Sequence, residues 1–129
     1  MDSPQPISVA LIDDDESVCR SLGRLLRAAG IRSVAYSSAE ALLADDRRPR
    51  LDCLVLDVQL PGLTGIELRE QLTASGDRTP VIFITAHDEP GVREQALATG
   101  CVAYLRKTDP GDAVLAAIRQ AAGIPAAKT

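Results

Sequence analysis

The stretch Ile7-Ser8-Val9-Ala10-Leu11-Ile12-Asp13-Asp14-Asp15 decides the fold, because an apolar run ends abruptly in three consecutive carboxylates. Polar residues hardly interrupt residues 7–12, which is typical of a strand buried on both faces of a parallel sheet. A helix is predicted next, because apolar residues recur at helical spacing at Val18, Leu22, Leu25, Leu26 and Ala29. Gly30 supplies the stop, so the chain begins as a strand followed by a helix.

The rest of the chain repeats this alternation. Short apolar runs predict four further strands, at residues 31–36, 51–56, 81–84 and 101–105. Four more helices are expected: one opened by a Ser37–Glu40 capping box, one at 66–74 behind a Thr64–Glu67 capping box, one from Pro90 to Gly100, and a last one begun by Asp109-Pro110. The pattern predicts an α/β fold, a doubly wound five-stranded parallel sheet with five helices on its two faces.

Length and composition narrow the class of protein. A chain of 129 residues with 46% apolar residues suits one domain with one core. The net charge of −4 argues against a nucleic-acid surface, and the basic run Arg47-Arg48-Pro49-Arg50 is expected to be a solvated loop.

The spacing of Cys19, Cys53 and Cys101 fits neither a metal-binding motif nor a redox dithiol. Neither a signal peptide nor a membrane span is evident, so a cytoplasmic location without membrane contact is expected.

Polar side chains stand where the predicted strands end. The first strand ends in Asp13, Asp14 and Asp15, and Asp57, Thr85 and Lys107 follow later strands. Because the carboxyl ends of parallel strands meet at one edge of the sheet, these groups are expected to converge there. Converging carboxylates repel one another unless a cation neutralises them, and hard oxygen ligands favour Mg²⁺. A carboxylate beside such a metal and an ammonium group is suited to attack phosphorus.

Four segments of the chain resemble one family. They are residues 9–15, residues 54–57 with the following Leu60-Pro61-Gly62 and Gly65, residues 83–86, and Tyr104 with Lys107. Together they look like the receiver domain of bacterial two-component response regulators, closest to the nitrogen-fixation type of transcriptional regulator. The resemblance implies a flavodoxin-like sheet with strand order 2-1-3-4-5. It also implies a receiver domain at residues 7–122, a disordered arm at 1–6, and a C-terminal tail or start of a linker at 123–129.

The resemblance further implies a role for each matching residue. Asp57 would accept a phosphoryl group, and Asp13, Asp14 and the backbone carbonyl of Gln59 would help it to hold Mg²⁺. Lys107 would hold the phosphoryl group, Thr85 and Tyr104 would form a switch pair, and Gln59 and His87 would tune hydrolysis. Thr108 departs from the family, which usually has proline after the lysine, so a trans Lys107–Thr108 bond and a reshaped loop are predicted.

The implied partners are a sensor histidine kinase or a phosphotransfer protein, and no nucleic acid. Family members often form homodimers through the fourth helix, fifth strand and fifth helix, but the composition of that surface here does not decide the matter. The domain would not be an enzyme beyond its own phosphotransfer and dephosphorylation.

Two alternatives remain open. One is a receiver that has lost phosphorylation and acts as an interaction module, for which Thr108 is the only support. The other is a phosphatase of the haloacid-dehalogenase class, because Asp13-x-Asp15 mimics its nucleophile motif. The phosphatase hypothesis leaves Asp57 without a role.

Overall fold

The computed structural model describes residues 6–123. Its five strands form one parallel sheet. Its strands are β1 (Ser8–Ile12), β2 (Arg32–Tyr36), β3 (Cys53–Asp57), β4 (Val81–Thr85) and β5 (Ala103–Arg106). The strand order is β2-β1-β3-β4-β5 and every pairing is parallel, which confirms the predicted topology. Of the predicted arm and tail, only Pro6 and Gly123 belong to the described residues.

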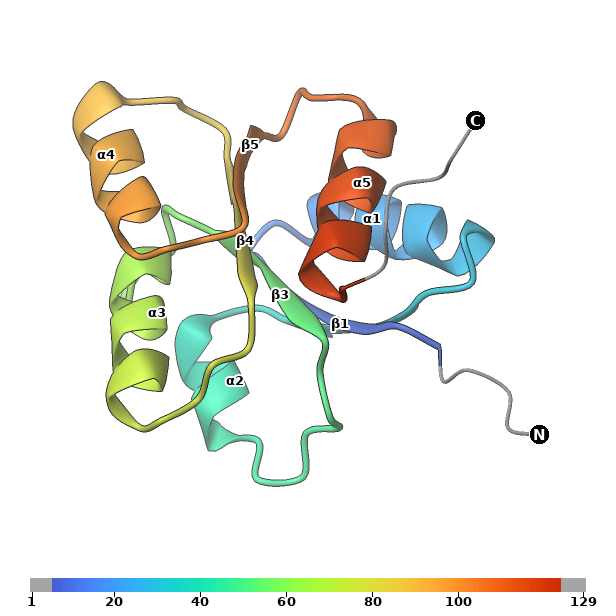
Figure 1. Ribbon diagram of the computed structural model, residues 1–129, viewed down its shortest axis with the longest axis horizontal. Coiled ribbons are helices and arrows are strands. Elements are labelled where there is room, and N and C mark those ends of the chain that lie inside the picture. Colours follow the sequence, from blue (N-terminus) through green and yellow to red (C-terminus); the bar gives the residue numbers. More distant parts are fainter. Residues whose placement is uncertain (1–5, 124–129) are drawn as a thin grey trace.

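Helices cover both faces of this sheet. They are α1 (Glu16–Ala28), α2 (Ala39–Ala44), α3 (Gly65–Ala74), α4 (Pro90–Ala98) and α5 (Gly111–Ala121). Figure 1 shows α1 and α5 on one side of the strands and α2, α3 and α4 on the other. The buried apolar side chains divide into two clusters in the same way, one under α1 and α5 and one under the other three helices. The doubly wound α/β architecture is therefore confirmed.

The central strands carry most of the core. All residues of β3 and β4 are buried, as is β1 beyond Ser8, whereas β2 at the edge buries only Tyr36. Each fully buried Leu, Ile or Phe in these strands stabilises the fold by about 1.5–3 kcal/mol relative to exposure. The carboxyl ends of β1, β3 and β4 are therefore held in place by well-packed, buried strands.

Two helix starts differ from the sequence prediction. Ser38, not Ser37, caps α2, and its hydroxyl accepts a hydrogen bond from the Ala41 amide. Glu40 therefore lies one position too early to complete a capping box. At α5 the N-cap is Pro110, and Asp109 instead accepts a hydrogen bond from the Arg106 amide. The predicted capping box of α3 and the proline in the first turn of α4 are confirmed.

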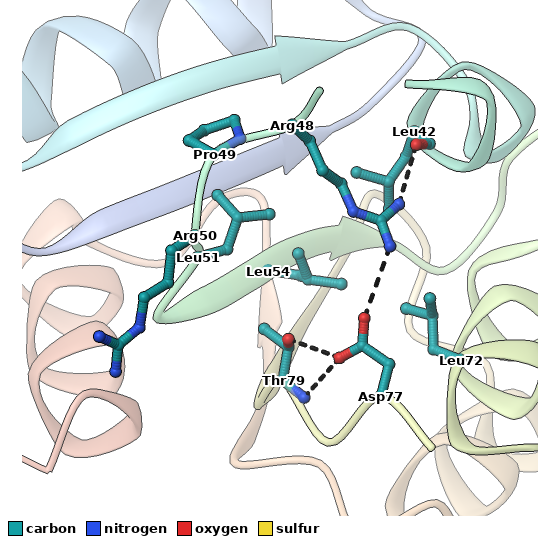
Figure 2. A pocket seen from close by; sticks show the side chains of 9 residues that line it. All are labelled: Leu42, Arg48, Pro49, Arg50, Leu51, Leu54, Leu72, Asp77 and Thr79. Atoms are coloured by element: carbon teal, nitrogen blue, oxygen red, sulfur yellow. Dashed lines mark hydrogen bonds and ion pairs between the residues drawn. The ribbon is translucent and has the colours of Figure 1, made fainter. Parts of the chain in front are cut away.

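The basic run between α2 and β3 is only partly a solvated loop. Arg47 and Arg50 are exposed, as predicted, but Arg48 is half-buried. Arg48 donates a hydrogen bond to the Leu42 carbonyl at 2.9 Å and pairs with Asp77 at 3.6 Å (Figure 2). These contacts border a hollow of about 270 Å³ near the amino ends of β3 and β4. The prediction was wrong for Arg48, because its guanidinium group bridges two loops that are distant in sequence.

Within residues 6–123, none of the helices has the length and apolar character that crossing a membrane requires.

A buried tyrosine joins β2 to the end of α2. The Tyr36 hydroxyl donates a hydrogen bond of 2.6 Å to an Asp45 carboxylate oxygen. Burial, together with this carboxylate, raises the pKa of Tyr36 to about 12 from the ordinary value of 10. A raised pKa in the folded state means that the stabilisation is fully present below pH 10 and is lost as the pH rises toward 12.

We therefore expect the free energy of unfolding to fall between pH 10 and 12, by about 2 kcal/mol from this group at the upper end. Urea unfolding of the wild-type chain and of Tyr36→Phe across this range measures the effect. Cys53, whose pKa burial also raises to about 12, contributes to both chains, so the difference between them isolates Tyr36. Parallel pH profiles for the two chains would contradict the prediction.

Candidate functional site

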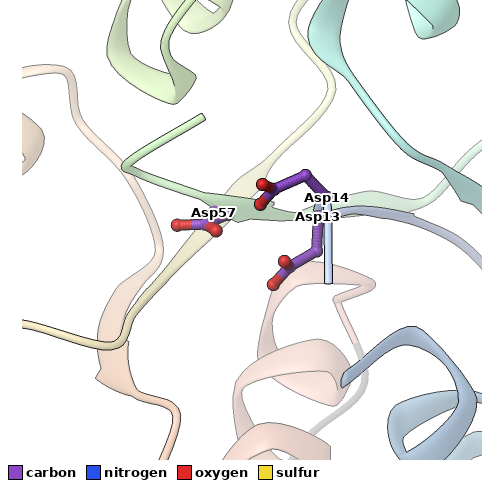
Figure 3. A group of neighbouring side chains, drawn as sticks. All are labelled: Asp13, Asp14 and Asp57. Carbon is purple, nitrogen blue, oxygen red and sulfur yellow. The ribbon is translucent and has the colours of Figure 1, made fainter. Parts of the chain in front are cut away.

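Three carboxylates meet where β1 and β3 end. Asp13 and Asp14 follow β1, Asp57 is the last residue of β3, and one oxygen from each lies within 4.8 Å of the others. Figure 3 shows the three side chains gathered at this edge of the sheet. Asp57 belongs to β3 itself and pairs in register with Ile84 of β4, so the sheet fixes its backbone. The convergence expected from the strand ends is present.

The three carboxylates have different surroundings. Asp13 is 3% exposed, and its Oδ1 accepts a hydrogen bond of 2.9 Å from the Asp15 amide. Asp57 is 4% exposed, and its Oδ1 accepts a hydrogen bond of 2.9 Å from the Gln59 amide. Asp14, by contrast, is exposed. The site thus has two sheltered acidic groups and one that faces solvent.

Lys107 supplies the positive charge of the site. Its Nζ lies 2.8 Å from Asp13 Oδ2 and 3.0 Å from Asp57 Oδ2. The Lys107–Thr108 bond is trans, as predicted, and the Lys107 amide donates to the Thr85 carbonyl at 2.8 Å. That backbone bond fixes the start of the loop after β5, so the lysine reaches the acidic groups without a following proline.

The charges of the site do not balance. Burial raises the pKa of Asp13, because the ionised carboxylate loses water. Burial by itself lowers the pKa of Lys107, but Asp13 and Asp57 outweigh it and the pKa is raised overall. Three ionised carboxylates and one ammonium would leave an excess of two negative charges, and two of the three carboxylates are buried.

This donor set fits a divalent cation. Asp13 Oδ2 is buried, and its polar partner in the described part of the chain is the Lys107 ammonium at 2.8 Å, which Asp57 shares. Carboxylate oxygens together with open water positions are the ligands that Mg²⁺ prefers. Asp13, Asp14 and Asp57 are the residues that could hold such an ion, and Gln59 is close enough in sequence to add its backbone carbonyl.

Thr85 is the last residue of β4, the strand next to Asp57, and Tyr104 lies on β5, one strand further. The Thr85 hydroxyl is buried and donates a hydrogen bond of 2.7 Å to the His87 carbonyl. The Tyr104 ring packs in the cluster under α4, and its hydroxyl is buried without a hydrogen-bond partner among the described residues. Burial raises the pKa of Tyr104. The His87 side chain is exposed in the loop after β4.

The sequence prediction missed the roles of three acidic residues near the site. Asp15 caps α1 through its bonds with Ser17 and Val18, so it does not join the acidic group. Asp88, in the loop after β4, pairs with Arg106 of β5 at 3.1 Å. Glu40 of α2 binds the loop after β3. Only the Asp15-x-Ser17 pattern, a common N-cap sequence, could have been recognised beforehand.

Comparison with known proteins gives the same picture over nearly the whole chain. The family described as response regulator receiver domain matches residues 9–119. The response regulator protein TodT of Pseudomonas putida is 34% identical over 113 residues, which cover 88% of this chain and 50% of that protein. The transcriptional regulatory protein FixJ of Azorhizobium caulinodans is 36% identical over 122 residues, or 93% of this chain and 57% of that protein.

A solved structure agrees with these relatives. The crystal structure of FixJ-N superposes with a TM-score of 0.85 at 30% identity, covering 97% of this chain and all of that one. The chain spans about half the length of the curated relatives it matches. FixJ is among those relatives, as the resemblance to nitrogen-fixation regulators predicts.

Gly65 lets the first turn of α3 sit against the end of β3. A Cβ atom there would overlap the Asp57 carbonyl oxygen and lie 3.0 Å from Val58 Cα. We expect Gly65→Ala to lower the free energy of unfolding by about 1–3 kcal/mol, because backbone atoms must shift.

Gly91→Ala is the matched control, since Gly91 also lies in the first turn of a helix and nothing stands within 4 Å of its Cβ position. That variant should be neutral or more stable by up to about 1 kcal/mol. Urea unfolding of both variants tests the close approach, and equal effects would contradict it.

Lys107 is expected to stabilise the metal-free domain. Lys107→Gln removes the ammonium from Asp13 and Asp57, so the free energy of unfolding without metal should fall by about 1–3 kcal/mol, the cost of leaving buried acceptors unsatisfied. Added Mg²⁺ should stabilise this variant more than the wild type, because the ion no longer competes with an ammonium group. Thermal unfolding with and without Mg²⁺ measures both effects, with Arg50→Gln as the exposed control. An equal Mg²⁺ increment in the wild type and Lys107→Gln would argue against this electrostatic account.

Proposed function

The chain belongs to the response regulator receiver domain family, and on that premise we propose that it accepts a phosphoryl group on Asp57 in a Mg²⁺-dependent reaction. The donor is a sensor histidine kinase or a phosphotransfer protein, and the resulting change of surface controls an output or partner. The observation that supports this most is the Asp57 carboxylate, sheltered at the end of β3 and held 3.0 Å from the Lys107 ammonium.

In the proposed transfer, an Asp57 carboxylate oxygen attacks the phosphorus of a phosphohistidine. The new O–P bond forms as the P–N bond breaks, and the leaving imidazole keeps the electron pair and takes a proton. Lys107 then binds a phosphoryl oxygen in place of the carboxylates it now contacts. Mg²⁺, held by Asp13, Asp14, Asp57 and the Gln59 carbonyl, would offset charge on the transferring group.

The phosphoryl group adds roughly −1.5 to −2 charges and three acceptor oxygens. Thr85 can donate to one of them only by giving up its bond to the His87 carbonyl. That exchange would remove one of the bonds that hold the loop between β4 and α4, while the Arg106–Asp88 pair remains. Tyr104, whose hydroxyl is already buried, would repack beside Thr85, and the two residues would form the switch pair.

The remaining roles follow from the same premise. The side chains of Gln59 and His87, both exposed, would control access of water to the acyl phosphate. The domain would act in the cytoplasm, catalyse only its own phosphorylation and dephosphorylation, and bind no nucleic acid directly. A homodimer would use the face of α4, β5 and α5.

Neither alternative is favoured. The phosphatase hypothesis needs Asp15 at the reacting centre, but its Oδ1 is occupied by the amide and hydroxyl of Ser17. The hypothesis of an inactive receiver depends on Thr108, yet Lys107 lies beside Asp57 without a following proline.

The direct test is incubation with Mg²⁺ and a small phosphodonor such as acetyl phosphate, followed by mass spectrometry of the intact protein. We expect one added phosphoryl group per chain, lost on chelation of the metal before mixing. Asp57→Asn should abolish the labelling, whereas Asp46→Asn, which changes an exposed aspartate in the loop after α2, should not.

An unlabelled wild-type chain would refute the proposal. Repeated turnover of a chromogenic phosphomonoester would favour the phosphatase instead.

A further inference from the structure

A side chain of α2 reaches the loop that follows the proposed phosphorylation site. Glu40 Oε2 accepts a hydrogen bond of 2.9 Å from the backbone amide of Leu63, 23 residues away in sequence. The loop runs from Val58 to Thr64 and connects β3 to α3. Glu40 is exposed and its side chain makes no other bond to a distant residue in the described chain.

Gly62 leaves room for this carboxylate. A Cβ atom at Gly62 would lie 2.6 Å from Glu40 Oε2, which is closer than such atoms approach in real structures. Gly62 also has a φ of 72°, a conformation that side-chain-bearing residues rarely adopt. A side chain at position 62 would therefore strain the backbone and displace the Glu40 carboxylate from its present position.

Each end of the loop has its own anchor. At the start, the Gln59 amide donates to Asp57 Oδ1, and the Val58 carbonyl accepts from the Gly65 amide. At the end, Thr64 and Glu67 form the capping box of α3. Residues 60–63 lie between these anchors, and Glu40 is the group outside the loop that binds their backbone.

We propose that Glu40 is a positioning residue for phosphorylation: by holding the Leu63 amide it fixes the β3–α3 loop, and with it the Gln59 carbonyl, in place for Mg²⁺. The inference rests on the proposed function, because the Gln59 carbonyl matters only if the site binds the metal. Glu40 touches neither the metal nor the phosphoryl group. Its effect is on the apparent affinity for Mg²⁺ rather than on the attacking carboxylate.

The proposal requires an acceptor oxygen within hydrogen-bond distance of the Leu63 amide. It does not require that this oxygen carry a negative charge. The bond from the Leu63 amide lowers the pKa of Glu40, so the group is a carboxylate at neutral pH. A glutamine side chain at this position would keep one acceptor oxygen at the same reach, whereas alanine would keep none. The pair Glu40→Gln and Glu40→Ala thus separates loss of the contact from loss of one negative charge near the metal.

The experiment measures acetyl phosphate labelling of the full chain as a function of Mg²⁺ concentration. For Glu40→Ala we expect the Mg²⁺ concentration at half-maximal rate to rise about 3- to 10-fold, less than the 10- to 100-fold typical of groups that bind a metal ligand directly. The rate at saturating Mg²⁺ should change less than twofold. Glu40→Gln should stay within about twofold of the wild type, because the acceptor oxygen remains.

Glu70→Ala is the matched control for charge, since Glu70 is an exposed glutamate of α3 that borders the same hollow as Gln59. It should leave the Mg²⁺ dependence within twofold of the wild type. A shift in Glu70→Ala or Glu40→Gln as large as that in Glu40→Ala would overturn the proposal in favour of simple electrostatics.

A second readout does not depend on labelling. Amide hydrogen exchange at Leu63 should be faster in Glu40→Ala than in the wild type, with the amides of β3 unchanged. Gly62→Ala should raise the Mg²⁺ concentration at half-maximal rate in both the wild type and Glu40→Ala, because alanine is strained at this φ in either chain. The rise should be larger in the wild type, because only there does the new Cβ also conflict with the Glu40 carboxylate.

The two proposals fail in different ways. A wild-type chain that is never labelled overturns the proposed function, while the exchange at Leu63 still reports on the contact. A labelled wild type with the same Mg²⁺ dependence and the same Leu63 exchange in Glu40→Ala overturns the positioning role alone.

Discussion

The repulsion between carboxylates at one edge of a parallel sheet governs the organisation of this molecule. Asp13 and Asp57 are nearly fully buried and would repel each other strongly without the Lys107 ammonium between them. The lysine removes only part of the excess charge, because one ammonium pairs with both Asp13 and Asp57. Oxygen ligands gathered in this way suit a divalent cation, whose binding to the folded state would stabilise it.

The acidic site lies between strands that the core holds firmly and loops that have fewer contacts. Strands β3 and β4 are wholly buried, so the backbones of Asp57 and Thr85 are fixed by the core. The loops that follow these strands are held by fewer bonds. The loop after β3 is anchored at both ends and bound by Glu40 between these anchors, and the Thr85 hydroxyl and Arg106 hold the loop after β4. The backbone of Asp57 is thus fixed by the sheet, whereas the loops beside it depend on a small number of hydrogen bonds and ion pairs.

Side-chain contacts between distant segments explain two places where sequence prediction failed. Ser37 and Glu40 have the spacing of a capping box, but Ser38 caps α2 and Glu40 turns to Leu63. Arg48 stands in a basic run that is typical of a solvated loop, yet it pairs with Asp77 across a hollow. In both cases the partner lies more than 20 residues away, and local spacing carries no information about it.

The sequence alone determined the alternation of strands and helices and the convergence of acidic groups, because hydrophobic periodicity and the direction of parallel strands follow from local chemistry. It also pointed to the receiver family through four short motifs. Only the tertiary structure decided how the three meeting carboxylates are sheltered, with Asp13 and Asp57 buried and Asp14 exposed. It likewise decided that Lys107 reaches Asp57 without a following proline. These outcomes depend on distances of a few ångströms between segments, which packing sets and sequence spacing does not.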